Sequence, residues 1–214
     1  MKIDCTGCLH GHYPKLEGGD LLIVTGDLTA RDTLGEMSFE FITWIEKQNY
    51  QKKIVIAGNH DTILENEGVE KIFHPFCDYL LDSGTEFEGL KIWGSPWTLK
   101  FKGQNPHAMA FCVDTEEELA EKWAMIPDDT DILVTHGPPK GILDRNIYDV
   151  SCGSKSLRRI MGKVKPKIWV FSHIHEEHGE YKDNTLSGIE YHFINCSHVN
   201  ERYKPVNKPV RVGL

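Results

Sequence analysis

The sequence Leu21–Asp27 (LLIVTGD) contains five apolar or β-branched residues, followed by a glycine and a carboxylate. Three more short apolar runs occur along the chain, at Ile54–Ala57, Ile132–Val134 and Ile168–Phe171. Runs of this kind predict strands that are buried on both faces, as in parallel sheets. Because parallel strands end at the same edge of a sheet, we expect the polar residues that follow these runs to lie close together.

A helix is predicted between the first two runs. In Glu36–Gln48 the apolar residues Phe39, Ile42 and Ile45 recur at helical spacing, next to Trp44. The two runs and this segment therefore predict a strand, a helix and a second strand in succession.

Other segments add helices and antiparallel strands. Thr115–Glu118 (TEEE) has the form of a capping box before Leu119–Met125, and Ser154–Met161 suggests a helix before the fourth run. Phe87–Trp93 alternates around a glycine and predicts antiparallel sheet, as does Ile189–Ile194. The chain is therefore expected to have an α/β fold.

Length and composition limit the possible functions. The 214 residues are 40% hydrophobic and 26% charged, so we expect residues 1–214 to form a single domain. No apolar stretch reaches the roughly 18 to 20 residues of a membrane span, and Met1–Cys5 lacks a signal-peptide pattern, so a cytoplasmic protein is expected. The six scattered cysteines are expected to be reduced. A net charge of −8 argues against nonspecific binding to nucleic acid.

Each apolar run leads into side chains that commonly bind metals. Asp27 follows the first run, Asn59 the second and His136 the third, while His173 and His175 follow the fourth. Carboxylate, amide and imidazole donors together suit manganese, iron or zinc. A single carboxylate such as Asp27 can also bridge two cations. The sequence therefore predicts a site for two metal ions.

Four sequence blocks resemble, in order and spacing, the signature of the calcineurin-like metallophosphoesterase superfamily. They are Gly26–Thr29 (GDLT), Gly58–Asp61 (GNHD), Thr135–Pro139 (THGPP) and Ser172–His175 (SHIH). Their details are similar to the small MPPED-like branch of phosphodiesterases. The resemblance implies two mixed β-sheets sandwiched between helices, in four layers.

The resemblance also implies a role for each matching residue. Asp27 matches the carboxylate that bridges the two metals. His60 matches a residue that contacts the phosphate and protonates the leaving oxygen, and Asp61 is expected to orient it. The expected ligands of the second metal are Asn59, His136 and His173, and those of the first are His10 and His175, with Cys8 at the remaining position. Asn59 and His60 are also expected to bind the substrate.

The implied activity is hydrolysis of a small phosphate ester or cyclic nucleotide. Two divalent or mixed-valence ions, of manganese, iron or zinc, would activate a bridging hydroxide for in-line attack on phosphorus. A phosphodiesterase is favoured over a protein phosphatase of the same superfamily. The sequences of those phosphatases contain a Gly-Asp-x-Val-Asp-Arg-Gly block, which this chain lacks. The sequence gives no indication of oligomeric state.

Cys8 departs from the pattern of the superfamily. It lies in Thr6–Gly11 (TGCLHG), where the superfamily has an aspartate. One interpretation is that the thiolate binds metal and favours zinc or iron over manganese or magnesium. The other is that the first site is weakened, which would leave a nucleotide-binding or regulatory protein. A smaller departure is Ser172, which replaces the usual glycine and adds a hydroxyl near the site.

Overall fold

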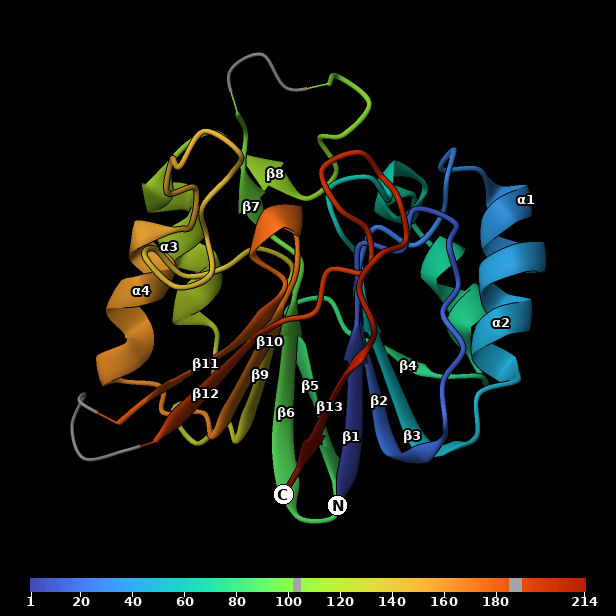
Figure 1. The fold of residues 1–214 in the computed structure, drawn as a ribbon, viewed down its shortest axis with the longest axis horizontal. Coiled ribbons are helices and arrows are strands. Elements are labelled where there is room, and N and C mark those ends of the chain that lie inside the picture. Colours follow the sequence, from blue (N-terminus) through green and yellow to red (C-terminus); the bar gives the residue numbers. More distant parts are fainter. Residues whose placement is uncertain (102–104, 185–189) are drawn as a thin grey trace.

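Two mixed β-sheets lie face to face in the centre of the molecule, and helices cover the outer face of each (Figure 1). This computed structural model describes residues 1–101, 105–184 and 190–214. The first sheet contains, in spatial order, β13 (Val210–Gly213), β1 (Lys2–Thr6), β2 (Gly19–Thr25), β3 (Tyr50–Ile56) and β4 (Asp78–Tyr79). Its strands are parallel, except for β13, which pairs antiparallel with β1.

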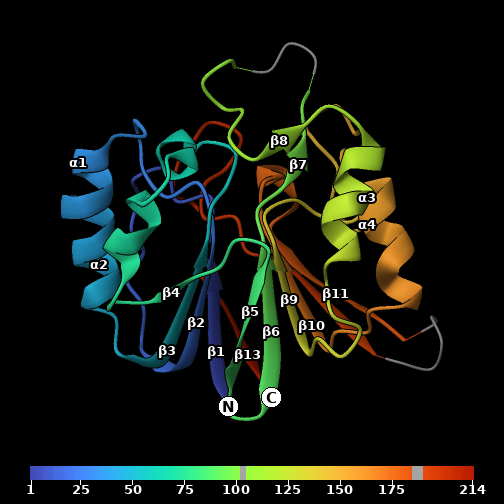
Figure 2. The same ribbon diagram turned by 180° about the vertical axis from the view of Figure 1, so that it is seen from behind.

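The second sheet is built on the same plan. It contains, in spatial order, β11 (Gly179–Asp183), β12 (Tyr191–Asn195), β10 (Ile168–Phe171), β9 (Ile132–Thr135), β6 (Leu90–Ser95) and β5 (Ser83–Phe87). The four central strands are parallel, and the two outer strands, β11 and β5, are antiparallel to their neighbours. A separate short parallel pair, β7 (Thr98–Leu99) and β8 (Cys112–Val113), lies above the sheets in Figure 2.

One helical layer covers the first sheet. It consists of α1 (Leu34–Glu36) and α2 (Ile42–Glu46), which are joined by a wider π-helical turn over Met37–Phe41. The predicted helix is therefore present, but Phe39 does not lie on its buried face: its side chain is 80% exposed. The wider turn rotates Phe39 away from the sheet and places Phe41 against it instead.

The other helical layer covers the second sheet and matches the predicted helices. It consists of α3 (Glu116–Ala124) and α4 (Lys155–Arg159), and the latter continues as a 3₁₀ turn over Ile160–Gly162. The capping box before α3 is confirmed by two hydrogen bonds. The Thr115 side chain accepts one from the Glu118 N–H, and the Glu118 side chain accepts the other from the Thr115 N–H. Further 3₁₀ turns span Thr62–Glu65, Val69–Phe73 and His175–Glu177.

Apolar side chains fill the spaces between all four layers. Along the central strands, alternate residues point between the sheets, as do Ile23 and Ile132, while Leu22 and Leu133 pack beneath the helices. Both faces of these strands are therefore buried, and this explains why their sequences are continuous apolar runs. The predicted four-layer fold is confirmed.

The predicted antiparallel segments are also found, with one part outside the described residues. Phe87–Trp93 contains the turn of the β5–β6 hairpin. Of Ile189–Ile194, Ile189 lies outside the described residues, and Tyr191–Ile194 falls in β12, which pairs antiparallel with β11 and parallel with β10. Within the described ranges, no helix has the length and apolar character needed to cross a membrane.

Candidate metal centre

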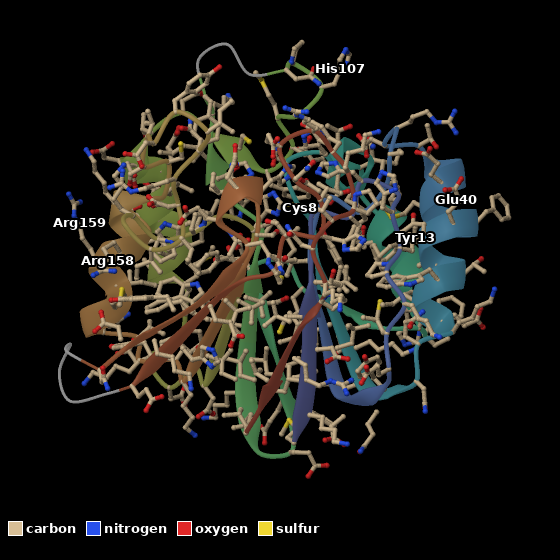
Figure 3. The ribbon with its side chains drawn as sticks, viewed as in Figure 1. Cys8, Tyr13, Glu40, His107, Arg158 and Arg159 are labelled. Carbon is tan, nitrogen blue, oxygen red and sulfur yellow. The ribbon has the colours of Figure 1, made fainter. Side chains whose placement is uncertain are left out.

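The expected metal-binding residues all follow the carboxyl ends of central strands. Figure 3 shows Cys8 at this end of the sheets, in the middle of the molecule. Loops from both sheets meet there, and within each sheet a backbone hydrogen bond joins neighbouring loops. The N–H of Cys8 donates to the Gly26 carbonyl at 2.9 Å, and the N–H of Ser172 donates to the His136 carbonyl at 2.9 Å. The side-by-side strands therefore bring residues far apart in sequence to one place.

Four of these residues have an unusual backbone. Cys8, His10, Asp27 and His173 adopt positive φ angles of 45°, 45°, 54° and 67°. A side chain with a Cβ is disfavoured in this left-handed region, at a cost of about 1–3 kcal/mol per residue. Such strain persists where surrounding contacts hold it, and it is concentrated at functional sites.

Glycines allow the loops to approach one another. A Cβ on Gly58 would lie 2.3 Å from Asp27 Oδ1 and 2.4 Å from His136 Cε1. Gly26 has a φ of 93°, and a Cβ on it would lie 2.4 Å from the Gly58 nitrogen. Gly26 and Gly58 therefore permit the close approach of the loops that carry Asp27 and His136.

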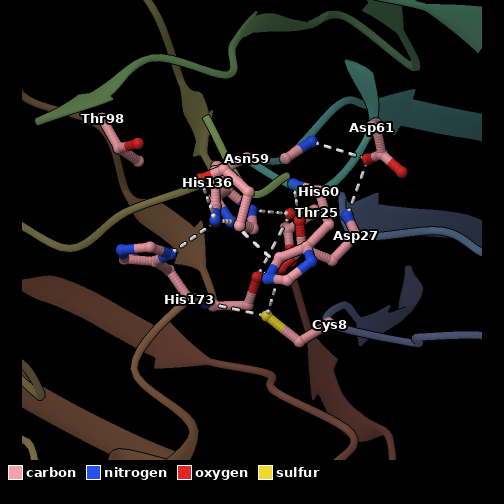
Figure 4. Close-up of polar contacts among 12 residues, drawn as sticks. Cys8, Thr25, Asp27, Asn59, His60, Asp61, Thr98, His136 and His173 are labelled. Atoms are coloured by element: carbon pink, nitrogen blue, oxygen red, sulfur yellow. Dashed lines mark hydrogen bonds and ion pairs between the residues drawn. The ribbon is translucent and has the colours of Figure 1, made fainter. Parts of the chain in front are cut away.

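Asp27 lies between two groups of donor atoms, and Figure 4 shows it near Cys8 of one group and His136 of the other. Its Oδ1 accepts a hydrogen bond from the His60 N–H at 2.9 Å. Its Oδ2 lies 3.4 Å from His10 Nε2, 3.5 Å from His136 Nε2 and 3.7 Å from Cys8 Sγ. Burial alone would raise the pKa of Asp27, but the neighbouring imidazoles, His136 first among them, lower it well below its usual value. Asp27 is therefore a carboxylate whose second oxygen faces both groups.

The first group consists of Cys8, His10, Asp27 and His175, whose donor atoms all lie within 4.8 Å of one another. The Nε2 atoms of His10 and His175 are 3.4 Å apart. His175 Nδ1 lies 3.1 Å from the Asn200 carbonyl, which only accepts, so Nδ1 carries the proton and Nε2 is directed inward with its lone pair. Burial lowers the pKa of His175, and it lowers that of His10 to about 3. Both imidazoles are therefore neutral, which is the form that binds metal.

The second group consists of Asp27, Asn59, His136 and His173. Asn59 Nδ2 donates to the Ala108 carbonyl at 3.0 Å, which directs Oδ1 towards His136 Nε2 and His173 Nδ1, each at 2.9 Å. His136 Nδ1 faces the Thr25 carbonyl at 2.7 Å, so its Nε2 carries a lone pair.

This arrangement leaves three electron-rich atoms facing one another: Asn59 Oδ1, Asp27 Oδ2 and His136 Nε2. Either a proton on His136 or a cation among the three atoms removes the repulsion. Without a cation, burial lowers the pKa of His136, but Asp27 and the Thr25 carbonyl together outweigh burial and raise this pKa above its usual value. The second group is therefore built to receive positive charge.

The separations in the first group also fit a metal ion. Bonds of about 2.0–2.1 Å from a tetrahedral ion to nitrogen or oxygen place neighbouring donors about 3.3–3.4 Å apart. The distance between His10 Nε2 and His175 Nε2 and the distance between His10 Nε2 and Asp27 Oδ2 are both 3.4 Å. The residues present therefore fit the metals that the sequence led us to expect.

Asp61 differs from its expected role. Instead of orienting the His60 ring, its carboxylate accepts hydrogen bonds from the backbone N–H groups of Asp27, Leu28 and Gly58, at 2.7–2.8 Å. Burial and the nearby Asp27 carboxylate raise the pKa of Asp61 to about 8, against the lowering effect of these hydrogen bonds. Asp61 therefore fixes the loop that carries Asp27.

A cavity of about 370 Å³ opens beside the two groups, and His60 lines it together with Asp27, Asn59, His173 and His175. The half-buried His60 ring contacts His10 edge-on, with ring centroids 4.8 Å apart. His60 is thus placed to reach a molecule in the cavity without belonging to either group.

Two aromatic residues border this cavity. Phe101 stacks on His173 with ring centroids 5.6 Å apart. Tyr203, which the sequence analysis missed, contacts His10 and His175 with centroids 4.7 and 5.4 Å apart. No motif surrounds Tyr203, so the sequence contained no signal for it.

Residues 1–177 match the family model described as calcineurin-like phosphoesterase. The chain belongs to this family of metallophosphoesterases. Similar proteins include the human metallophosphoesterase domain-containing protein 1, which is 34% identical over 92% of this chain and 65% of its own length. A UPF0046 protein of Caenorhabditis elegans is 33% identical over 94% of this chain and 75% of its own length. The chain thus spans about two thirds of the human relative.

Solved structures support the fold. A phosphopantetheinyl hydrolase from Mycobacterium tuberculosis superimposes with a TM-score of 0.60, covering 99% of this chain and 95% of its own. Its sequence identity is 16%, so this likeness concerns the fold of the family and not the substrate.

Proposed function

We propose that this metallophosphoesterase is a phosphodiesterase that hydrolyses a small phosphodiester, such as a cyclic nucleotide, with two divalent metal ions. In this proposal Cys8, His10, Asp27 and His175 hold the first ion, and Asp27, Asn59, His136 and His173 hold the second. The observation that carries the proposal is the position of Asp27 Oδ2, between two groups of donors that face inward with lone pairs.

When bound, the two ions supply an activated water for attack on phosphorus and positive charge for the phosphate oxygens. The chain's own residues do the rest. The Thr25 and Asn200 carbonyls hold His136 and His175 in the tautomers whose Nε2 atoms face inward. Asn59 and His60 face the cavity and contact the substrate, and His60 donates a proton to the leaving oxygen.

A diester is favoured over a monoester by the sequence blocks, which resemble the MPPED-like branch. The cavity of about 370 Å³ is within the range of about 300–1,000 Å³ that is usual for small-molecule sites. Cytoplasmic localisation remains a prediction from the sequence.

The test compares bis-p-nitrophenyl phosphate with p-nitrophenyl phosphate, after removal of metals and reloading with manganese, cobalt or zinc. We expect turnover of the diester to exceed that of the monoester and to require added metal. Faster hydrolysis of the monoester would contradict the diesterase.

The alternative proposal is a nucleotide-binding or regulatory protein in which Cys8 disables the first site. Tight binding of a nucleotide without hydrolysis, under all three metals, would support it. The close approach of Cys8 Sγ to Asp27 Oδ2, 3.7 Å, favours the enzyme, because it keeps a donor atom where the family has one.

A further inference from the structure

Cys8 gives the two donor groups different chemical character. The first group offers one sulfur, two imidazole nitrogens and one carboxylate oxygen. The second offers two oxygens, from Asp27 and Asn59, and two imidazole nitrogens. We propose that Cys8 binds metal as a thiolate and sorts two different ions, with a thiophilic ion such as zinc beside Cys8 and manganese in the second site. This inference rests on the proposed two-metal function.

The position of the sulfur supports ligation. Bonds of about 2.3 Å to sulfur and about 2.0–2.1 Å to oxygen place the two donors of a tetrahedral ion about 3.6 Å apart. Cys8 Sγ lies 3.7 Å from Asp27 Oδ2, and its donor atom lies within 4.8 Å of those of His10 and His175. The left-handed backbone at Cys8 and at His10 turns both side chains towards this point.

Burial and the nearby Asp27 carboxylate raise the pKa of the Cys8 thiol well above its usual value, so the charge of a bound cation is needed to form the thiolate. One contact suited to the thiolate is already present. The His173 N–H donates to Cys8 Sγ at 3.0 Å, and such a bond stabilises negative charge on sulfur. It also links the first group to the loop that supplies the second. Cys8 is fully buried, so metal binding would replace the lost solvation of the thiolate and release the thiol proton to solvent.

Ligand softness then separates the two sites. Thiolate sulfur favours zinc and related ions, whereas carboxylate and amide oxygens suit manganese. Replacing the usual aspartate by cysteine leaves the formal charge of the first site unchanged, because both ligands are monoanions. The difference in metal preference therefore comes from the sulfur itself.

Cobalt provides a direct readout of the sulfur bond. Metal-free protein would be titrated with Co²⁺ while absorbance is recorded in the near ultraviolet, where thiolate-to-cobalt charge transfer appears. We expect wild type to bind two Co²⁺ per chain and to show this band. Cys8→Asp is expected to bind two Co²⁺ and to lose the band. Cys152→Ser is the matched control, since Cys152 lines the same cavity outside the donor group, and it should keep the band.

A competition experiment tests the sorting. Metal-free wild type would be given one equivalent of zinc and dialysed against excess manganese, because zinc at equal concentration outcompetes manganese at nitrogen and oxygen ligands. Metals would then be counted by mass spectrometry. We expect about one zinc and one manganese per chain in wild type, and a shift towards manganese in Cys8→Asp. A band that persists in Cys8→Asp, or equal metal ratios in both proteins, overturns the inference.

These results separate the inference from the proposed function. Two bound metals and diester hydrolysis without a charge-transfer band would refute sulfur ligation and leave the phosphodiesterase intact. One Co²⁺ per chain with the band would support sulfur ligation and contradict the two-metal enzyme. Absence of metal binding in a folded wild-type protein, checked by circular dichroism, would contradict both.

Discussion

At the scale of single residues, Asp27 and His60 have separable duties. Asp27 is the carboxylate shared by both donor groups, so Asp27→Asn is expected to lower bound metal to one ion per chain or fewer and to abolish turnover. Metal counting and the diester assay check this. Asp128→Asn, a change at an exposed residue, is the control and should match wild type.

His60 lines the cavity but belongs to neither group. We expect His60→Ala to retain both metals and to lower kcat about 10²–10⁴-fold, the usual contribution of a general acid. Loss of metal from this variant, to the same extent as from Asp27→Asn, would contradict the roles assigned.

Asp61 is expected to support metal binding by holding the backbone of the loop that carries Asp27. Because its carboxylate accepts from three N–H groups of the loops that carry Asp27 and Gly58, Asp61→Ala is expected to weaken metal binding about 10–100-fold. Leaving these buried donors unpaired is also expected to lower the free energy of unfolding by about 1–3 kcal/mol. Metal titration and urea unfolding measure the two effects, and an unchanged metal affinity would show that the loop does not depend on Asp61.

At the scale of elements, hydrogen bonds to the Glu116 side chain link the start of α3 to the start of α4. Its carboxylate accepts hydrogen bonds from the backbone of Lys155 and Ser156 and from the hydroxyls of Ser154 and Ser156. Burial raises the pKa of Glu116, but these hydrogen bonds outweigh it and lower the pKa below its ordinary value of 4.5.

A lowered pKa means that the folded state favours the carboxylate. This stabilisation is present above pH 4.5 and is lost as the pH falls through the lower folded pKa. We therefore expect Glu116→Ala to unfold at lower urea concentration than wild type at pH 7, with the difference shrinking at pH 3. A difference that is the same at both pH values would argue against a charged link between the helices.

The central strands could be predicted from the sequence, because a strand that is buried on both faces has a continuous apolar run. The exposure of Phe39 was not predicted, since a π-helical turn changes which residues share a face without changing composition. At the site, most side-chain donors follow predicted strand ends and could be named from the sequence, whereas Cys8 and His10 were named only from the family resemblance. The carbonyls of Thr25, Ala108 and Asn200 could not, because every residue has a carbonyl and only the fold selects these three.

At the scale of the whole molecule, the metals are expected to join the two sheets, because ligands come from loops of both. Metal present at about 100 times its Kd should add about 3 kcal/mol to the free energy of unfolding. For a chain of this size the midpoint of thermal unfolding should rise on the order of 5–10 °C. A chelator should reverse the rise, and Asp27→Asn should show little of it. An equal rise in Asp27→Asn would place the stabilising metal elsewhere.

The organisation of residues 1–214 as one domain remains a prediction, and a single cooperative transition in thermal unfolding would support it.

Our main proposal is that Asp27 is shared by two metal ions. Anomalous diffraction from crystals grown with zinc and manganese tests it most directly. We expect two peaks flanking Asp27 Oδ2, one beside Cys8 and one beside Asn59. A single peak, or peaks away from Asp27, would contradict it.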